Sequence, residues 1–492
     1  MKKFYLSTAL PYVNSPPHAG FALEIIQADA IARYYRLLSE EVFFLSGTDE
    51  NSLKNVRAAE EEGISIKKLV DRNAKKFYEL KKALNLSFDD FIRTTEQRHI
   101  KGAQKLWLAC QKDIFKKKYK GLYCVGCEEF YKESELENGL CPEHKKKPEL
   151  VEEENYFFKL SRYQNQLRKI IEKDKIKIIP QTRKNEVLSF INSGLEDICI
   201  SRSAERAQGW GVPVPGDSDQ IQWCWFDALS NYINALGYAK NSKKFQEWWQ
   251  KNENKLHIIG KGILRFHAIY WPGILLSAKL PLPNKIFVHG YLTSGGQKMS
   301  KSLGNVVDPF ELVKKYGTDP VRYFLLREIL PTEDGDFTYE KFEKRYNADL
   351  ASGLGNLVAR VITLAARSNS KSQIPNHKQI PNPKLQTAIK KTWKEYKKAL
   401  EEFKFNEALI SIWDLISFCD RYIEKERPWE IKNKKSLPCW QAGKIKNQKV
   451  ISDLLFALDS IAEMLKPFLP ETSEKILKQL KTKKSEPLFP RI

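Results

Sequence analysis

The spacing of apolar residues changes along this chain, and the change predicts its elements. Four short apolar runs are typical of buried parallel strands: residues 3–8, 41–46, 256–259 and 285–289. A repeat at helical spacing follows the first run: Leu23, Ile26, Ala30 and Tyr34. A second helical stretch, residues 263–278, separates the last two runs. Strands joined by helices predict a doubly wound α/β domain that binds its ligand at the carboxyl ends of the strands.

From about Asp336 onward the apolar spacing is helical. Two sets of apolar residues recur at intervals of three and four residues. The first set is Leu409, Ile412, Ile416 and Cys419, and the second is Ile451, Leu454, Leu458, Ile461 and Leu465. The polar stretch 367–384 is expected to be a loop between helices. The carboxyl-terminal part is therefore predicted to be an α-helical bundle.

The excess of lysine and arginine over acidic residues indicates a polyanionic binding partner. The 492 residues are 42% hydrophobic and carry a formal net charge of +21, which favours nucleic acid over a membrane. A lysine-rich proteome is the alternative explanation. Ser7, Thr8 and Pro11 interrupt the apolar start, which argues against a signal peptide, and no apolar run reaches membrane-spanning length. A soluble, cytoplasmic protein without a membrane partner is expected.

Three of the eight cysteines form a metal-site pattern with a histidine. Cys124-x-x-Cys127 and Cys141-x-x-His144 are two knuckles that together offer three thiolates and one imidazole. Four protein ligands close the coordination shell, so one structural Zn²⁺ in a polar insert is predicted. Chance or redox cysteines are the alternative.

A glycine-flanked loop, residues 290–305, carries two lysines three positions apart, Lys298 and Lys301. Two ammonium groups on such a loop suit a polyphosphate whose charge peaks in a transition state. A solvated basic turn is the alternative. His18, in Pro17-His18-Ala19-Gly20-Phe21, enters the first helix, where a phosphate would meet the positive helix end. A capping or surface histidine is the alternative there.

These two segments resemble the signatures of class I aminoacyl-tRNA synthetases. Lys298-Met299-Ser300-Lys301-Ser302 matches KMSKS, and His18-Ala19-Gly20-Phe21 resembles H-x-G-H. Further segments resemble the methionyl-tRNA synthetases in chain order: residues 9–14, 47–50, 225–232, 260–267 and 271–272. The resemblance covers essentially the whole chain. It implies an aminoacyl-tRNA ligase that converts methionine and ATP into methionyl-adenylate and transfers the methionyl group to the 3′ end of tRNA(Met).

The resemblance also implies site residues and cofactors. Magnesium would accompany the ATP, and the phosphates would meet His18, Gly20, Phe21, Lys298, Ser300, Lys301 and Ser302. The methionine pocket would comprise Leu10, Tyr12, Asp49, Trp225, Ala228, Leu229, Tyr232, Ile263 and His267. Asp49 would hold the ammonium group, and the aromatic residues suit a polarizable thioether. By spacing alone, Trp225 and Tyr232 could equally be core residues.

The chain departs from the family pattern at two positions. Phe21 stands where the first signature ends in histidine, and Gly262 stands where aspartate is common. Arg202 matches an arginine that pairs with that aspartate in some members, so its partner here is open. A non-catalytic tRNA-binding paralogue is one alternative that these departures leave open.

The family places anticodon recognition on two helices of the bundle, here Asn356 with Arg360, and Trp429. A surface pair and a capping tryptophan are the alternative. The predicted domains are a Rossmann-type catalytic half, a zinc-binding insert, the second catalytic half, a stem-contact segment with KMSKS, and the anticodon bundle: residues 1–115, 116–180, 181–290, 291–346 and 347–492. No further tRNA-binding segment follows, so a monomer is expected.

Two other enzyme classes share part of this pattern. The first is a class I synthetase for leucine, isoleucine, valine or cysteine. The enzymes for leucine, isoleucine and valine usually carry a long editing insert, for which residues 116–180 leave no room. A general nucleotidyltransferase with a similar histidine turn explains neither the knuckles nor the helical bundle.

Overall fold

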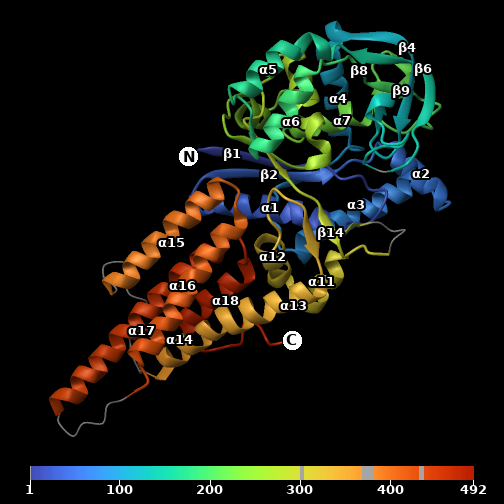
Figure 1. Ribbon diagram of the computed structural model, residues 1–492. Helices are drawn as coiled ribbons and strands as arrows, with labels where there is room; N and C mark the ends of the chain where they lie inside the picture. The colour runs from blue at the N-terminus through green and yellow to red at the C-terminus, as the bar shows by residue number, and fades with distance from the viewer. Residues whose placement is uncertain (1, 144, 300–303, 368–381, 431–436) are drawn as a thin grey trace. The chain divides into compact units, whose positions relative to one another are not determined.

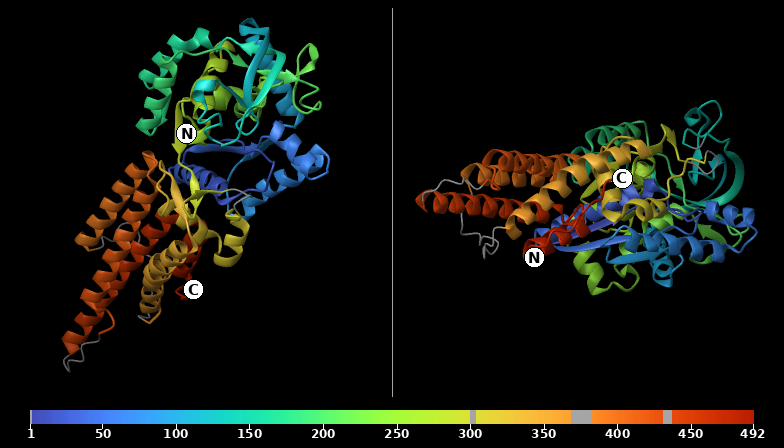
Figure 2. Two further views of the ribbon diagram at one scale, coloured as in Figure 1. Left: turned by 45° about the vertical axis from the view of Figure 1, so that its right-hand side comes forward. Right: turned by 90° about the horizontal axis from the view of Figure 1, so that it is seen from below.

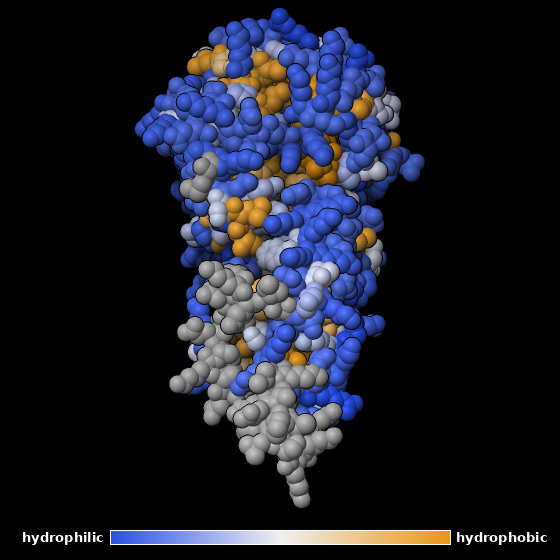
Figure 3. All heavy atoms as spheres, turned by 90° about the vertical axis from the view of Figure 1, so that its left-hand side faces the viewer, coloured by the Kyte–Doolittle hydropathy of each residue, from blue (hydrophilic) through white to orange (hydrophobic). Residues whose placement is uncertain are grey.

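The computed structural model describes the whole chain except residues 1, 144, 300–303, 368–381 and 431–436 (Figure 1). The chain divides into two compact units, Met1–Lys82 with Leu86–Gly290, and Ala83–Asn85 with Tyr291–Ile492. Each unit has its own buried apolar core. On the face shown in Figure 3, hydrophilic side chains cover most of the described surface.

The first unit is built on a parallel sheet of six strands in the order β3-β2-β1-β12-β13-β7. Its strands are β1 (Lys3–Thr8), β2 (Glu41–Thr48), β3 (Asp90–Arg93), β7 (Lys177–Ile179), β12 (Lys255–Gly260) and β13 (Lys285–His289). The strand order reverses direction at β1 and β12, which pair in parallel with Tyr5 opposite Lys255. This confirms the doubly wound sheet, whose reversal point is the usual ligand site.

Helices connect these strands, and α1 lies where the repeat from Leu23 to Tyr34 predicts a helix. The first-unit helices are α1 (Ala19–Leu37), α2 (Leu53–Glu61), α3 (Ile66–Ala83), α4 (Gln97–Cys110), α5 (Gln164–Glu172), α6 (Gln181–Asn192), α7 (Cys224–Leu229), α8 (Asn231–Asn234), α9 (Lys243–Phe245) and α10 (Trp271–Ser277). The helical stretch 263–278 is irregular, because a π-helical turn at Phe266–Tyr270 precedes α10. Such turns often occur at functional sites.

The cysteine knuckles lie in an insert with an antiparallel sheet of its own, in the order β5-β4-β6-β8. Its strands are β4 (Ile114–Cys124), β5 (Glu129–Tyr131), β6 (Glu149–Phe158) and β8 (Ile198–Cys199). A further sheet contains β9 (Ser201–Ser203), β10 (Pro213–Val214) and β11 (Asp217–Gln222). Strand β7 falls within the range 116–180 predicted for the insert, yet it pairs with β13 in the catalytic sheet. The insert range therefore needs correction at that end, because a three-residue strand gives too weak a pattern to identify.

The second unit opens with a small sheet and continues as helices. Its strands are β14 (Leu292–Ser294), β15 (Gln297–Lys298) and β16 (Gly335–Phe337). Its helices are α11 (Pro309–Tyr316), α12 (Thr318–Arg327), α13 (Tyr339–Arg345), α14 (Asn356–Arg367), α15 (Pro383–Glu401), α16 (Phe405–Glu426), α17 (Leu437–Leu465) and α18 (Pro470–Thr482), with a π-helical stretch at Tyr346–Gly355. Helices α15, α16 and α17 pack against one another (Figure 2), which confirms the bundle.

The predicted apolar positions of the bundle face its interior. All nine side chains of the two repeats are buried, from Leu409 on α16 to Leu465 on α17. Most of the stretch 367–384, predicted to be a loop, lies outside the described residues.

Candidate active site

The turn between β1 and α1 places His18 at the amino end of the helix. His18 has extended backbone angles and is the N-cap of α1, and its Nδ1 accepts the backbone N–H of Gly20 at 3.0 Å. A Cβ at position 20 would lie 2.8 Å from His18 Cε1, so glycine lets the imidazole fold back over the turn. Because Nδ1 accepts a hydrogen bond, the proton of a neutral ring is on Nε2. The ring is thus fixed at the positive end of a buried helix, a suitable place for a phosphate.

Phe21 has a packing contact that accounts for its apolar side chain. It is buried on α1, and its ring meets that of Phe77 on α3 edge to face, with centroids 5.0 Å apart. The ring therefore contributes to the packing of α1 against α3.

An aromatic cluster lies where β1, α7 and the π-helical turn meet. The Trp225 indole stacks on Phe266 with centroids 3.9 Å apart and meets His267 edge to face at 6.1 Å. Tyr12, just beyond β1, meets Trp225 edge to face at 6.2 Å. Ala228 and Leu229 are buried on the same short helix as Trp225. The structure therefore brings these predicted pocket residues together.

His267 is held as a neutral ring by two hydrogen bonds. Its Nδ1 lies 2.9 Å from the carbonyl oxygen of Ile263, which can only accept, so Nδ1 carries the proton. Its Nε2 lies 2.7 Å from the Tyr232 hydroxyl, which therefore donates to it. Burial lowers the pKa of His267 to about 4. The ring presents a fixed, uncharged surface at neutral pH.

Asp49 is the buried carboxylate of this region. It follows β2, forms a parallel bridge with Tyr12, and is 1% exposed. Burial, and then the neighbouring Asp227, raise its pKa well above the ordinary value, although the backbone N–H of Asn51 donates to it at 3.1 Å. A cation bound beside Asp49 would favour the charged carboxylate. This is the electrostatic setting expected of an ammonium-binding group.

Asp227 is a second buried carboxylate near Asp49, and it is not among the residues predicted from the sequence to form the pocket. Its Oδ2 accepts from the Asn51 side chain at 3.0 Å, and its Oδ1 lies 3.5 Å from His99 Nε2. Burial raises its pKa well above the ordinary value. Asp227 lies in the segment 225–232, but the sequence of that segment does not indicate which distant residues contact its carboxylate.

The cysteine cluster fits a metal ion among the described residues. The Sγ atoms of Cys124, Cys127 and Cys141 all lie within 4.8 Å of one another, and the last two are 3.4 Å apart. The Tyr131 hydroxyl donates to the Sγ atom of Cys127 at 3.0 Å. Three converging thiols in a small polar insert match the donor set of structural zinc. The predicted fourth ligand, His144, lies outside the described residues.

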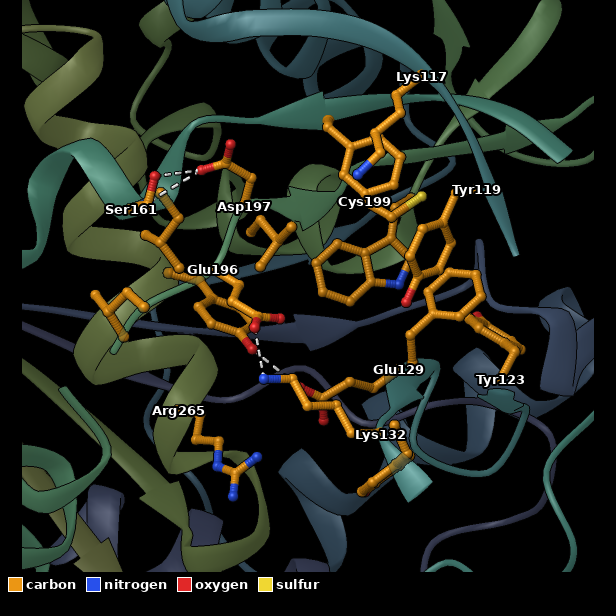
Figure 4. Close-up of a pocket in the computed structure, with 18 of the residues that line it drawn as sticks. Lys117, Tyr119, Tyr123, Glu129, Lys132, Ser161, Glu196, Asp197, Cys199 and Arg265 are labelled. Atoms are coloured by element: carbon orange, nitrogen blue, oxygen red, sulfur yellow. Dashed lines mark hydrogen bonds and ion pairs between the residues drawn. The ribbon is translucent and has the colours of Figure 1, made fainter. Parts of the chain in front are cut away.

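A cavity of about 820 Å³ lies beside the antiparallel sheet of the insert, lined by residues of β4, β5, β6 and β8 and by Phe190 on α6. Tyr119, Tyr123 and Glu129 line one side, and Lys132 crosses it to pair with Glu196 at 2.6 Å (Figure 4). Among the described residues, none of those predicted to contact phosphate or methionine lines this cavity.

The KMSKS segment begins on a hairpin of the second unit. Strands β14 and β15 pair through Thr293 and Lys298, and the glycines between them have the positive φ angles of a tight turn. Asp336 accepts from the Gly296 N–H and the Thr293 hydroxyl, both at 2.7 Å. Ser300, Lys301 and Ser302 lie outside the described residues.

The predicted anticodon residues lie together on the helical unit. The Arg360 guanidinium is 5.9 Å from the Trp429 ring and pairs with Glu424 at 2.5 Å and Asp420 at 3.6 Å. Trp429 is 45% exposed, and Asn356 is exposed one helical turn before Arg360. An exposed aromatic face beside a planar cation suits the stacking of unpaired bases.

Every helix within the described residues is too short or too polar to cross a bilayer.

Two family models match the chain. The model described as tRNA synthetases class I (M) matches residues 4–147 and 133–362, and the anticodon-binding domain of tRNA ligase matches residues 384–490.

Named relatives match nearly the full chain. Methionine–tRNA ligase of Brucella suis is 41% identical over 97% of this chain and 91% of its own length. The enzyme of the same name from Thermotoga maritima is 40% identical over 97% of this chain and 75% of its own length. Among solved structures, Mycobacterium tuberculosis methionyl-tRNA synthetase in complex with methionyl-adenylate superposes with a TM-score of 0.91 at 38% identity, covering 97% of this chain and 93% of that one.

Proposed function

This chain belongs to the class I methionyl-tRNA synthetases, and from that premise we propose how its residues activate methionine with ATP and charge tRNA. In the first step the methionine carboxylate attacks the α-phosphate of ATP, giving methionyl-adenylate and pyrophosphate. In the second step a hydroxyl of the terminal ribose of tRNA(Met) takes the methionyl group and releases AMP. Positioning and charge stabilisation supply most of the catalysis.

The observation that carries the methionine assignment is the neutral aromatic cluster of Trp225, Tyr232 and His267 with Tyr12 beside it. An unbranched thioether gains from polarizable, uncharged walls, and a protonated imidazole there would need its own counter-ion. We propose that the remaining predicted residues complete this pocket: Leu10, Ala228, Leu229 and Ile263. Asp49 then holds the substrate ammonium group.

His18 would serve the phosphates of ATP from the amino end of α1, with Gly20 giving its ring room. Lys298 and Lys301, with Ser300 and Ser302, would neutralise the charge that grows on the phosphates, and magnesium would accompany the nucleotide. The packing of Phe21 supports leaving this task to His18 and the lysines.

Cys124, Cys127 and Cys141, with His144, would hold one zinc ion, which orders the insert and takes no part in the reaction. Asn356, Arg360 and Trp429 would read the anticodon. We further propose a cytoplasmic monomer with the five domains described above, except that β7 belongs to the catalytic sheet.

Pyrophosphate exchange into ATP, measured with each of the twenty amino acids, tests this proposal. Exchange with methionine and with no other amino acid is the expected result. Exchange with a different amino acid would overturn the pocket assignment. A folded, zinc-loaded protein that binds tRNA without any exchange would identify a non-catalytic paralogue instead.

A further inference from the structure

The turn that follows the first cysteine knuckle is joined to the aromatic pocket by two indole groups. The backbone carbonyl of Cys127 accepts the Nε1–H of Trp225 at 3.3 Å. The carbonyl of the next residue, Glu128, accepts the Nε1–H of Trp223 at 2.6 Å. The position of the Trp225 ring therefore depends on where this turn of the insert lies.

Three elements hold that turn through the side chain of Glu128, which is fully buried. Its carboxylate lies 3.1 Å from the guanidinium of Arg202 on β9 and accepts the backbone N–H of Lys54 on α2 at 3.2 Å. The Tyr123 hydroxyl, on β4, also donates to it. A buried carboxylate is stable only with partners of this kind, so the three contacts fix its place tightly.

The backbone at Glu128 supports a specific role for its side chain. Its φ angle is 57°, in the left-handed region that glycine adopts at much lower cost. A glutamate persists at such a position when its side chain contacts compensate for the strain.

The same contacts identify a counter-ion for Arg202, whose partner the sequence left open. Arg202 is 4% exposed and needs a counter-ion, and Gly262 has no side chain that can provide one. The carboxylate within reach of Arg202 belongs to Glu128.

We propose that Glu128 is a positioning residue for methionine binding, which fixes the Trp225 wall of the pocket by anchoring the Cys127–Glu128 turn to Arg202, Lys54 and Tyr123. The inference rests on the proposed place of Trp225 in the methionine pocket. Glu128 acts through backbone carbonyls and an indole ring, so its loss alters the fit of methionine and leaves the phosphate chemistry intact.

The test compares Glu128→Gln and Glu128→Ala in the full-length, zinc-loaded protein. Lys54 and Tyr123 donate to different oxygens of Glu128, so glutamine keeps an acceptor for one of them and removes the charge that faces Arg202. Alanine removes every contact. Glu152→Gln is the matched control, because Glu152 lies on the same insert with its side chain 73% exposed. The active-site concentration of each protein is titrated by its adenylate burst, so that rates refer to folded enzyme.

The expected result is a rise of about tenfold in the methionine KM for Glu128→Ala and a smaller rise for Glu128→Gln, with kcat and the ATP KM within twofold of the parent. In protein labelled with 5-fluorotryptophan, the ¹⁹F signals of Trp223 and Trp225, assigned with Trp→Phe variants, should shift in both Glu128 variants. They should not shift in Glu152→Gln.

An unchanged methionine KM per active site, even with a smaller active fraction, would reduce Glu128 to a folding role and overturn the proposal. Unmoved Trp225 fluorine signals would overturn it as well. Addition of methionine to the unmutated protein separates this failure from that of the pocket assignment. If methionine leaves the Trp225 signal unmoved, the pocket assignment is wrong, and the inference that rests on it falls too.

Discussion

Individual side chains of the proposed methionine pocket are buried and titratable, and the direction of each pKa shift indicates the charge that each side chain favours. Burial raises the pKa of both Asp49 and Asp227, and Asp227 adds to the rise at Asp49, whereas His267 is buried as a neutral ring. The first arrangement favours an incoming cation, and the second keeps charge away from the thioether. Two substitutions test these functions separately.

Asp49→Asn should weaken methionine binding without destabilising the fold. Loss of a charge-assisted contact to the ammonium group should raise the methionine KM by about ten- to a hundredfold and leave the ATP KM unchanged. Since burial raises the pKa of Asp49, a neutral amide relieves a cost, so the thermal unfolding midpoint at pH 7 should stay equal or rise. An equal loss of affinity for both substrates would contradict this role.

His267→Gln should make the protein less sensitive to acid. The pKa of His267 is about 4 in the fold against 6.5 in the unfolded chain, so the unfolded chain alone takes up a proton as the pH falls from 6.5 toward 4. This group therefore lowers the free energy of unfolding with falling pH, by about 2 to 3 kcal/mol between pH 7.5 and 4.5. Urea unfolding at both values should show that the variant loses that much less stability than the parent. An identical pH dependence would mean that His267 is already charged in the fold.

At the scale of elements, the hairpin that leads into KMSKS depends on one carboxylate. Asp336, on β16, accepts from the turn at Gly296 and from Thr293 on β14. Burial raises the pKa of Asp336, but these hydrogen bonds lower it by more, so the carboxylate remains ionised into the acidic pH range. The strand pairing alone involves only two residue pairs, Thr293 with Lys298 and Ser294 with Gln297.

Asp336→Ala should therefore slow adenylate formation. With the turn released, the lysines that follow it would be held less accurately, and the turnover number of pyrophosphate exchange should fall by about ten- to a hundredfold. The methionine KM should change less than twofold, because Asp336 belongs to the second unit and the proposed pocket residues belong to the first. Glu340→Gln, in the first turn of α13, serves as a control on a nearby acidic residue. A rise in the methionine KM with normal turnover would contradict the hairpin's proposed role.

At the scale of the whole molecule, the residues proposed for methionine binding and those proposed for anticodon recognition fall in different units. The proposed methionine residues belong to the first unit, whereas Arg360 and Trp429 belong to the helical second unit. A net charge of +21 adds a long-range attraction for tRNA that does not depend on base identity.

Trp429→Ala should impair tRNA charging and leave pyrophosphate exchange intact. Loss of base stacking should raise the KM for tRNA(Met) by about ten- to a hundredfold. Raising the salt concentration should weaken tRNA binding by parent and variant with the same slope, because Trp429 neutralises no phosphate. Exposed Tyr339→Ala, which removes another aromatic ring of the second unit, is the control. Equal loss of exchange and charging would indicate a folding defect.

Local sequence sufficed for much of the architecture. Runs such as Lys3–Thr8 and Lys285–His289 matched strands to the residue, because the apolar centre of each run is buried within the parallel sheet. Spacing also identified the cysteine cluster, since two ligands in one turn must share an ion. The three-residue β7 gave no comparable pattern, so its membership of the catalytic sheet was missed.

Local periodicity and rare motifs were enough to predict the family, the doubly wound sheet and the helical bundle, and they supplied the candidate pocket residues. Tertiary structure alone decided which groups meet across long separations. It packs Phe21 against Phe77, sets Asp227 beside Asp49, and gives Arg202 its counter-ion in Glu128. Burial and charge act through space, so residues far apart in sequence acquire their chemistry only when the fold brings them into contact.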